Sequence, residues 1–226
     1  MIIYGKQLFL HLLKHHKEKF RKIYLAKELE KPLFKEVSRL NLDIIKVDPK
    51  KAQALAKGGN HQGYLAEVDE FEFAEFSALK DLNFLVVLYN LTDVGNIGAI
   101  LRTAYALGVD GVVVVANSLQ IPGIIRSSSG AAYEIPIALQ SDGLTLINEL
   151  KQAGFTTYAA DAKGKDIKGQ NFTQKKALIL GSEGEGIPKK AFIKCDELVA
   201  IKMRNGWDSL NVSSAFAIIC DMMING

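Results

Sequence analysis

The sequence predicts an α/β protein whose larger part is a parallel sheet with helices on both faces. Five short runs are continuously apolar, which is typical of parallel strands buried on both sides. Stretches with helical spacing separate these runs, and the repeated order of strand and helix favours a parallel sheet. The expected strands cover residues 84–90, 111–115, 156–160, 177–180 and 198–201, and the expected helices cover 97–107, 144–153, 188–194 and 212–224.

The first part of the chain predicts a second, smaller α/β unit. Short helices and strands alternate there, and Pro32 suits the first turn of a helix. The expected helices cover residues 7–15, 32–40 and 50–57, and the expected strands cover 22–25, 42–47 and 63–68. We interpret the acidic, phenylalanine-rich segment 69–76 as a linker whose phenylalanines pack on a neighbour. Its period-2 alternation also fits an edge strand.

Composition and local patterns exclude several classes of protein. The 226 residues are 48% hydrophobic and 23% charged, which indicates a soluble globular protein with a substantial core. The N-terminus lacks the pattern of a signal peptide, and no run approaches the ~18 apolar residues of a membrane span. Cys195 and Cys220 form no paired motif, so neither a disulfide framework nor a zinc site is expected. We therefore expect a cytoplasmic protein with no metal and no membrane partner.

The net charge of +3 conceals an uneven distribution along the chain. Residues 1–60 hold 14 Lys and Arg against 6 Asp and Glu, a net charge of +8, whereas residues 61–226 hold 14 against 19, a net charge of −5. Five cations cluster beside three histidines, which predicts a face that binds phosphate groups. The cations are Lys14, Lys17, Lys19, Arg21 and Lys22, and the histidines are His11, His15 and His16. A solvated, lysine-rich helix end is the alternative.

A glycine-rich loop, Gly181-Ser-Glu-Gly-Glu-Gly186, follows one of the expected strands. Its glycine spacing fits a phosphate-binding loop, but Ile187-Pro188 stands where that loop requires Lys-Ser/Thr. A third glycine of the dinucleotide-binding pattern is missing as well, because Lys189 occupies its place. The acids Glu183 and Glu185 disfavour ATP and NAD and favour a ligand with positive charge, such as the sulfonium of S-adenosylmethionine. A tight turn without a ligand is the alternative.

Two further segments carry polar groups at the expected ends of helices. The segment Ser209-Leu-Asn-Val-Ser-Ser214 precedes the last helix, where Ser and Asn are ordinary N-caps. Alternatively, Ser209 and Asn211 turn toward the glycine-rich loop and bind cofactor or substrate. Asn96 is expected to cap the helix that carries Arg102, the only basic residue between Lys80 and Arg126. A lone helical arginine is usually a solvated charge, but the small Gly98 one turn earlier would let a ligand or second chain approach.

Together the three motifs resemble those of the SpoU (TrmH) family of the SPOUT methyltransferases. The matching segments are Asn96-x5-Arg102, Gly181-x-Glu183-Gly-x-Gly186 and Ser209-Leu-Asn211-Val-Ser213, with further likeness at His61-Gln-Gly-Tyr-Leu-Ala66 and Gly130-Ala-Ala-Tyr-Glu-Ile-Pro136. The resemblance implies a C-terminal trefoil knot, which physical reasoning alone would not predict because knots are rare. It also implies an L30e-like, RNA-binding domain over residues 1–66, a linker over 67–80 and a methyltransferase domain over 81–226.

The family's activity is transfer of a methyl group from S-adenosylmethionine to a ribose 2′-hydroxyl of RNA. The small N-terminal domain makes the chain similar to bacterial enzymes that modify a guanosine of 23S ribosomal RNA. A methyltransferase acting on transfer RNA and a non-catalytic RNA-binding protein are the alternatives. The resemblance further implies a homodimer, with the helix of the first motif near the partner chain, and no role for DNA.

The resemblance also assigns roles to individual residues. It implies that backbone groups near Leu180, Gly181, Gly186, Ile201, Met203 and Leu210 hold the cofactor. In the family the arginine at position 102 is assigned to activating the hydroxyl. Because a guanidinium is almost always protonated, we favour Arg102 as a clamp on the adjacent phosphate that polarises the hydroxyl. The residues expected to position Arg102, the ribose and the cofactor are Asn96, Glu183, Ser209 and Asn211.

Two positions depart from the family's pattern. The family commonly has glycine two residues after the methionine of the third motif, whereas Asn205 follows Met203 here and the glycine comes one residue later, at Gly206. Because asparagine tolerates left-handed backbone conformations, we expect the turn to survive. Trp207 replaces a smaller apolar residue, which affects the expected substrate contacts more than catalysis.

Overall fold

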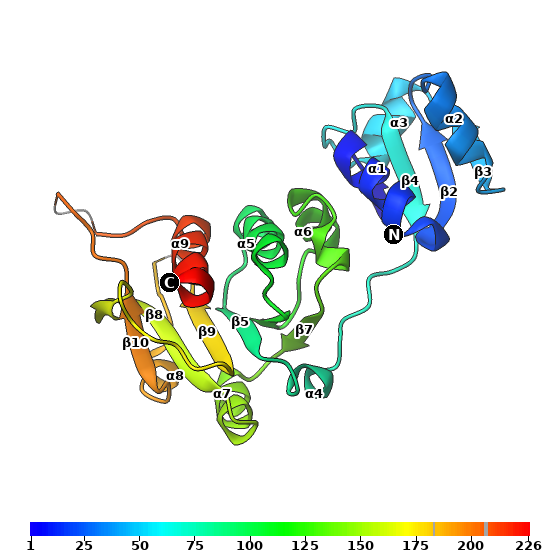
Figure 1. Ribbon diagram of the computed structural model, residues 1–226. Coiled ribbons are helices and arrows are strands. Elements are labelled where there is room, and N and C mark those ends of the chain that lie inside the picture. The colour runs from blue at the N-terminus through cyan, green and yellow to red at the C-terminus, as the bar shows by residue number, and fades with distance from the viewer. Residues whose placement is uncertain (183, 206–207) are drawn as a thin grey trace.

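The computed structural model describes residues 1–182, 184–205 and 208–226, and it contains two sheets that lie in different lobes (Figure 1). The smaller sheet has the strand order β1-β4-β2-β3. Strand β4 is antiparallel to β1 and β2, whereas β3 is parallel to β2. Its strands are β1 (Ile2–Tyr4), β2 (Phe20–Leu25), β3 (Asp43–Lys46) and β4 (Tyr64–Val68), and its helices are α1 (Lys6–His15), α2 (Lys31–Ser38) and α3 (Pro49–Leu55), with a short 3-10 turn at Lys17–Lys19.

The larger sheet has the strand order β10-β8-β9-β5-β6-β7, and all neighbouring strands in it are parallel. This confirms the prediction of a parallel sheet. Its strands are β5 (Phe84–Tyr89), β6 (Gly111–Val115), β7 (Ile137–Gln140), β8 (Thr156–Asp166), β9 (Lys176–Gly181) and β10 (Glu197–Ala200). Both β5 and β9 are central, which explains why their sequences are apolar throughout: both of their faces are covered.

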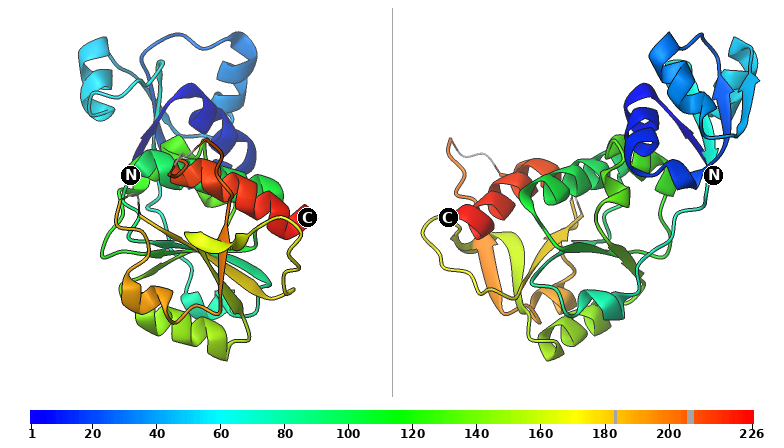
Figure 2. Two further views of the ribbon diagram at one scale, coloured as in Figure 1. Left: turned by 90° about the vertical axis from the view of Figure 1, so that its left-hand side faces the viewer. Right: turned by 45° about the vertical axis from the view of Figure 1, so that its right-hand side comes forward.

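Helices cover both faces of the larger sheet, as expected (Figure 2). Val86 and Leu88 of β5 pack in the core on the side of α5, α6 and α9, whereas Leu85 and Val87 pack on the side of α4, α7 and α8. This alternation follows from the two-residue period of a strand. The helices are α4 (Phe76–Leu79), α5 (Val94–Leu107), α6 (Ile121–Ser127), α7 (Gly143–Gln152), α8 (Lys189–Phe192) and α9 (Val212–Asn225), with a 3-10 turn at Ala131–Tyr133.

Several elements were not predicted from the sequence. Strands β1 and β7 are short, and α6 is a single short helix that starts beside a proline, so none of them shows a clear periodicity. Strand β8 continues past residue 160 to Asp166 through polar residues that give no apolar signal. Pairing of Lys165 and Asp166 with β10 holds this extension, and Gly164 permits the close approach, because a Cβ atom there would collide with the backbone of Val199.

The segment between the two sheets forms no strand, so the edge-strand alternative is not what the chain adopts. Phe71 and Phe73 pack edge to face with ring centroids 5.4 Å apart, and Phe71 also contacts Tyr133 of the larger lobe at 5.6 Å. The phenylalanines therefore pack on a neighbour, as the composition of the segment predicted. Within the described residues, no helix combines the length and the apolar character that crossing a membrane would require.

Candidate active site

A cavity of about 700 Å³ opens at the carboxyl end of β9, beside Ala160 in the middle of β8, and the carboxyl ends of strands are where ligands bind in open α/β sheets. Two of the three sequence motifs meet there. The glycine-rich loop after β9 forms one wall, and the start of α9 forms the other. The lining residues are Ala160, Leu180, Gly181, Ser182, Gly184, Gly186, Ser209, Leu210, Asn211, Val212 and Ala215.

The glycine-rich loop turns back on itself immediately after β9. The amide of Gly186 donates a hydrogen bond of 2.9 Å to the carbonyl of Ser182, and these residues form an isolated antiparallel bridge. Gly184 and Gly186 adopt φ values of 91° and 67°, a region that favours glycine. Gly181 has no room for a side chain, because a Cβ atom there would lie within 3.0 Å of the Gly186 and Ile187 backbone. The loop therefore presents backbone groups to the cavity.

Asn211 joins the third motif to the first. Its side-chain oxygen caps α9 by accepting hydrogen bonds from the amide and the hydroxyl of Ser213, at 3.0 and 2.6 Å. Its amide group donates to the side-chain oxygen of Asn96 at 2.9 Å. Asn211 is thus both an ordinary N-cap and a member of the cavity wall, so the two interpretations of this motif are compatible.

Two expectations for the first motif are wrong. Asn96 does not cap α5, because Asp93 is the N-cap and accepts a 2.7 Å hydrogen bond from the Asn96 amide. Gly98 does not admit a ligand or second chain, since a Cβ atom there would collide with Ser127 of α6. The sequence carried the signal for the cap, because Asp93 stands immediately before the first helical residue. The small residue serves the close packing of α5 on α6.

Arg102 lies apart from this cavity. It is exposed on α5, six residues after Asn96, which is about 9 Å along the helix axis. Its side chain lines a different hollow, of about 580 Å³, that faces α1 of the smaller lobe. The two hollows share no lining residue among those described. Within one chain, therefore, Arg102 does not face the cavity of the glycine-rich loop.

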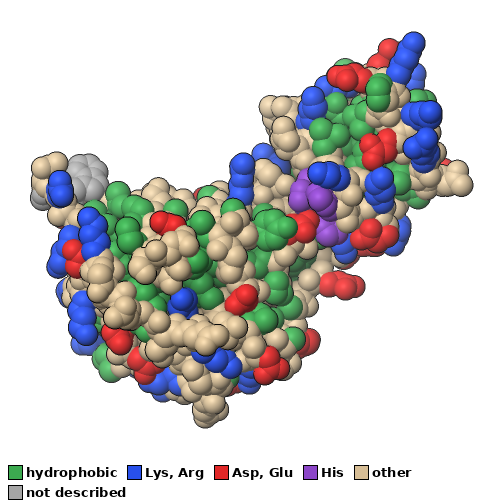
Figure 3. Space-filling view, viewed as in Figure 1, with side chains coloured by type: hydrophobic (Ala, Val, Ile, Leu, Met, Phe, Trp, Pro, Cys, Tyr) green, Lys and Arg blue, Asp and Glu red, His purple; other side chains and the backbone are tan. Residues whose placement is uncertain are grey.

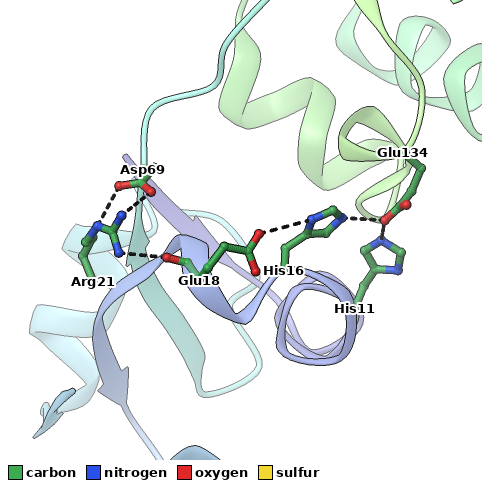
Figure 4. A network of polar contacts seen from close by, with 6 residues as sticks. All are labelled: His11, His16, Glu18, Arg21, Asp69 and Glu134. Carbon is green, nitrogen blue, oxygen red and sulfur yellow. Dashed lines mark hydrogen bonds and ion pairs between the residues drawn. The ribbon is translucent and has the colours of Figure 1, made fainter. Parts of the chain in front are cut away.

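The two lobes are joined by a carboxylate that two histidines share (Figure 4). His11 and His16 each donate from Nε2 to the same oxygen of Glu134, at 2.7 Å. Burial raises the pKa of Glu134, but the hydrogen bonds from His16 and His11 outweigh it and hold that pKa below the usual value of 4.5. The ligand atoms of these three residues lie within 4.8 Å of one another, a grouping that could also hold a metal ion.

The lowered pKa of Glu134 predicts how stability depends on pH. A carboxylate whose pKa is lower in the folded than in the unfolded protein stabilises the native state at pH values above the unfolded-state pKa. This stabilisation is lost as the pH falls through the folded-state pKa. The melting temperature of wild-type protein should therefore exceed that of Glu134→Gln at neutral pH, and the difference should shrink below about pH 4.5. Thermal denaturation over a pH series measures it. A difference that is constant with pH would contradict the shared-carboxylate interpretation.

The predicted basic face is partly neutralised. Arg21 forms a two-pronged ion pair with Asp69, and Lys17 pairs with Glu36 at 3.0 Å. Lys22 lies 3.9 Å from Asp43. Of the five clustered cations, Lys14 and Lys19 make no ion pair with any described residue, and Lys14 lines the hollow that contains Arg102. Ion pairs thus reduce the positive charge of three of the five cations, and phosphate binding by this face stays a prediction.

The two cysteines are free thiols. Burial raises the pKa of Cys195 to about 11 and that of Cys220 to about 12. Both thiols are therefore protonated at neutral pH, and a protonated thiol is a poor nucleophile and a poor metal ligand.

The remaining site predictions have mixed outcomes. Asn205 adopts a φ of 59°, which confirms that it tolerates the left-handed turn after Met203. Ile201 and Met203 are half-buried and are not among the described residues that line the cavity, so their role stays a prediction. The predictions for Glu183, Gly206 and Trp207 lie outside the described residues. The cavity wall also contains Ser182, Gly184 and Val212, which the motifs include without an assigned role, and Ala160 and Ala215, which sequence reasoning missed. Ala160 carried a signal, as the last residue of an apolar run that ends at this edge of the sheet.

Comparison with known families decides the class of protein. Residues 83–221 match the SpoU rRNA methylase family, and residues 2–74 match the substrate-binding region of RNA 2′-O ribose methyltransferases. The chain belongs to the SpoU methylase family. Enzymes of this family use S-adenosylmethionine as the methyl donor.

Individual SpoU relatives cover most of the chain. A 23S rRNA (guanosine-2′-O-)-methyltransferase, RlmB, from Shewanella oneidensis is 31% identical over 96% of this chain and 94% of its own. An uncharacterized tRNA/rRNA methyltransferase from Archaeoglobus fulgidus is 33% identical over 78% of this chain and 81% of its own. The SpoU methyltransferase AviRb from Streptomyces viridochromogenes, solved with AdoMet, has a TM-score of 0.80 at 24% identity and covers 98% of this chain and 88% of that chain. The last likeness shows that the fold is shared.

Proposed function

We propose that this SpoU methylase transfers a methyl group from S-adenosylmethionine to the ribose 2′-hydroxyl of a guanosine in 23S ribosomal RNA. One observation carries the proposal: the glycine-rich loop and the segment Ser209–Asn211 line a single cavity at the strand ends, with Asn96 bonded to that wall. Because only RNA has a 2′-hydroxyl, RNA rather than DNA is the substrate.

The cavity suits S-adenosylmethionine in size and in chemistry. Its volume of about 700 Å³ falls within the range of small-molecule sites. Backbone groups of the glycine-rich loop offer hydrogen bonds to the adenine and the amino-acid portion. Leu180 and Leu210, which is 37% exposed, offer apolar surface. A nucleoside triphosphate would require a lysine and a hydroxyl residue after the loop, and Ile187-Pro188 stands in their place.

The reaction requires that a weak nucleophile be held in line with a methyl group. S-adenosylmethionine, when bound, would supply an electrophilic methyl group for transfer to the ribose oxygen, and the hydroxyl proton would leave to solvent. Positioning of the two reactants is the main task of the protein. Asn96, Ser209 and Asn211 would orient the ribose and the cofactor. Arg102 would hold the adjacent phosphate and polarise the hydroxyl.

The separation of Arg102 from the cavity supports a homodimer in which this residue serves the partner's site. Apolar side chains exposed on α5 and α9 offer a contact surface, because Tyr105 is 50% and Ile218 39% exposed on these two helices. The space-filling view shows hydrophobic side chains on this upper side of the larger lobe (Figure 3). Such a dimer makes activity depend on both chains, which mixing two inactive variants can test.

Further family features complete the proposal. A trefoil knot of the C-terminal segment is supported by the strand order, in which β9 lies between β8 and β5 while the chain continues past β10 into α9.

Residues 1–66 would form an L30e-like domain that binds RNA, residues 67–80 a linker and residues 81–226 the methyltransferase domain. The substrate-binding match over residues 2–74 supports ribosomal over transfer RNA, because the N-terminal part is shared with the RlmB relative. The reaction would take place in the cytoplasm.

Two linked measurements test this function. Isothermal titration should show that S-adenosylmethionine or its demethylated product binds the protein. Mapping of 2′-O-methyl groups in ribosomal and transfer RNA, from cells with and without the gene, should then show one guanosine of 23S rRNA that loses its methyl group. Binding of ATP or NAD without any binding of S-adenosylmethionine would refute the proposal. Loss of a methyl group from transfer RNA instead would support the proposed reaction but identify transfer RNA as the substrate.

A further inference from the structure

We propose that the hollow between α1 and α5 binds a backbone phosphate of the RNA, so that the N-terminal lobe and Arg102 grip the same strand. The inference rests on the proposed function and identifies a substrate-binding subsite for it. The hollow, of about 580 Å³, lies where the two lobes meet. Its lining residues are Gln7, Leu10, His11, Lys14 and His15 of α1, together with Arg102 and Ser129.

The lining of this hollow matches an anion. Arg102 and Lys14 make no ion pair with any described residue, and no carboxylate is among the described residues that line the hollow. Arg21 and Lys17 of the same lobe, in contrast, are paired with Asp69 and Glu36. Two uncompensated cations that face one hollow repel each other until an anion binds between them. The planar fork of an arginine suits two oxygens of a phosphate, and a lysine adds a point charge.

The hollow is also held in shape before any ligand binds. Glu134 accepts hydrogen bonds from His11 and His16, which fixes α1 against the larger lobe. Gly130 permits this contact, since a Cβ atom there would lie within 3.0 Å of the His11 ring. The space-filling view shows the histidine side chains gathered at the junction of the lobes (Figure 3). Lys14 of α1 and Arg102 of α5 therefore line the hollow from the two lobes that this contact joins.

Two neutral residues, Ser129 and Gln7, complete the lining of the hollow. The hydroxyl of Ser129 and the side-chain amide of Gln7 add neutral donors beside the two cations. A phosphodiester carries one charge and several acceptor oxygens, which this combination of donors would satisfy.

The test measures RNA binding against salt with an unmodified transcript of 23S rRNA. Replacing Lys14 with alanine should lower affinity and reduce the slope of log affinity against log salt by about 0.7–0.9, the value of one lost phosphate contact. Arg102→Ala should do the same. If both residues bind one phosphate, the RNA affinity of the double variant should fall by less than the product of the two fold-losses of the single variants. Lys190→Ala, an exposed lysine of α8 on the opposite face of the sheet, is the matched control and should leave the slope unchanged.

The outcomes separate this inference from the proposed function. A wild-type protein that methylates the transcript, with a Lys14→Ala variant of unchanged salt slope, would overturn the phosphate subsite alone. Fold-losses that multiply in the double variant would show two independent contacts and overturn the shared grip. Binding of inorganic phosphate by the wild type, without any change of slope in Lys14→Ala, would assign the hollow to a free anion. Absence of S-adenosylmethionine binding and of methylation would refute the proposed methyltransferase activity. The slope of log RNA affinity against log salt would still test the phosphate subsite.

Discussion

Replacement of Arg102 by alanine is expected to abolish methyl transfer while the affinity for S-adenosylmethionine stays within a few-fold of wild type. Arg102 lines no part of the cavity that suits the cofactor, so its loss should leave cofactor binding intact. It is the cation proposed to hold the phosphate and polarise the hydroxyl, and this interaction is needed during the reaction. Turnover by the variant above about a tenth of wild type, which corresponds to roughly 1.4 kcal/mol, would show that Arg102 is not catalytic.

Two further variants make this result specific. Arg102→Lys keeps the charge but loses the planar fork, so partial activity would assign part of the effect to charge alone. Lys168→Ala removes an exposed charge of the larger lobe that lines neither hollow, and it should retain full turnover. Single-turnover kinetics with saturating cofactor measure all three variants on one scale.

Mixing experiments decide which chain Arg102 serves. The Arg102→Ala chain keeps its cavity, whereas a chain with a disrupted cavity, such as Gly181→Ala, keeps its arginine. If Arg102 acts in the partner's site, mixing the two proteins at a cofactor concentration too low to fill the Gly181→Ala site should restore part of the activity, because each mixed dimer contains one complete site. Absence of recovery, with mixed dimers present by native mass spectrometry, would place Arg102 and the cavity in the same chain.

Replacement of Gly181 by alanine is expected to weaken cofactor binding by about ten-fold or more. A Cβ atom at this position would lie within 3.0 Å of the backbone of Gly186 and Ile187, and backbone cannot swing away as a flexible side chain can. Overpacking of this kind costs about 1–3 kcal/mol, and each 1.4 kcal/mol lost from binding is about ten-fold in affinity. The loop must open, which displaces the backbone groups that face the cavity. Isothermal titration with S-adenosylmethionine measures the loss.

A glycine outside the cavity controls for the general effect of removing a glycine. Gly169 has a φ of 70°, and no other group lies within 4 Å of the place that a Cβ atom would take, so Gly169→Ala strains its own turn without touching the cavity. It should lower the melting temperature slightly and leave cofactor affinity unchanged. Wild-type affinity in Gly181→Ala would mean that the close turn of the loop does not shape the cofactor site.

The larger sheet could be predicted because the burial of its strands on both faces is visible in their sequences. Runs such as 84–90 and 177–180 are apolar almost throughout, and only strands covered on both faces require this. Strand β7 and the polar end of β8 could not be predicted in the same way. Their residues are held by pairing with β6 and β10, so the cause lies in segments distant in sequence.

The sequence by itself determined the family, the parallel sheet and the motif residues, because these depend on local pattern and residue type. Only the tertiary structure decided how the motifs are grouped. It bonded Asn96 to Asn211, 115 residues later, and it turned Arg102 of the same helix toward α1. It also packed Gly98 against Ser127 and hydrogen-bonded His11 and His16 to Glu134. The physical reason is that the direction of a side chain from a helix, and what meets it there, depend on packing between segments that no local pattern records.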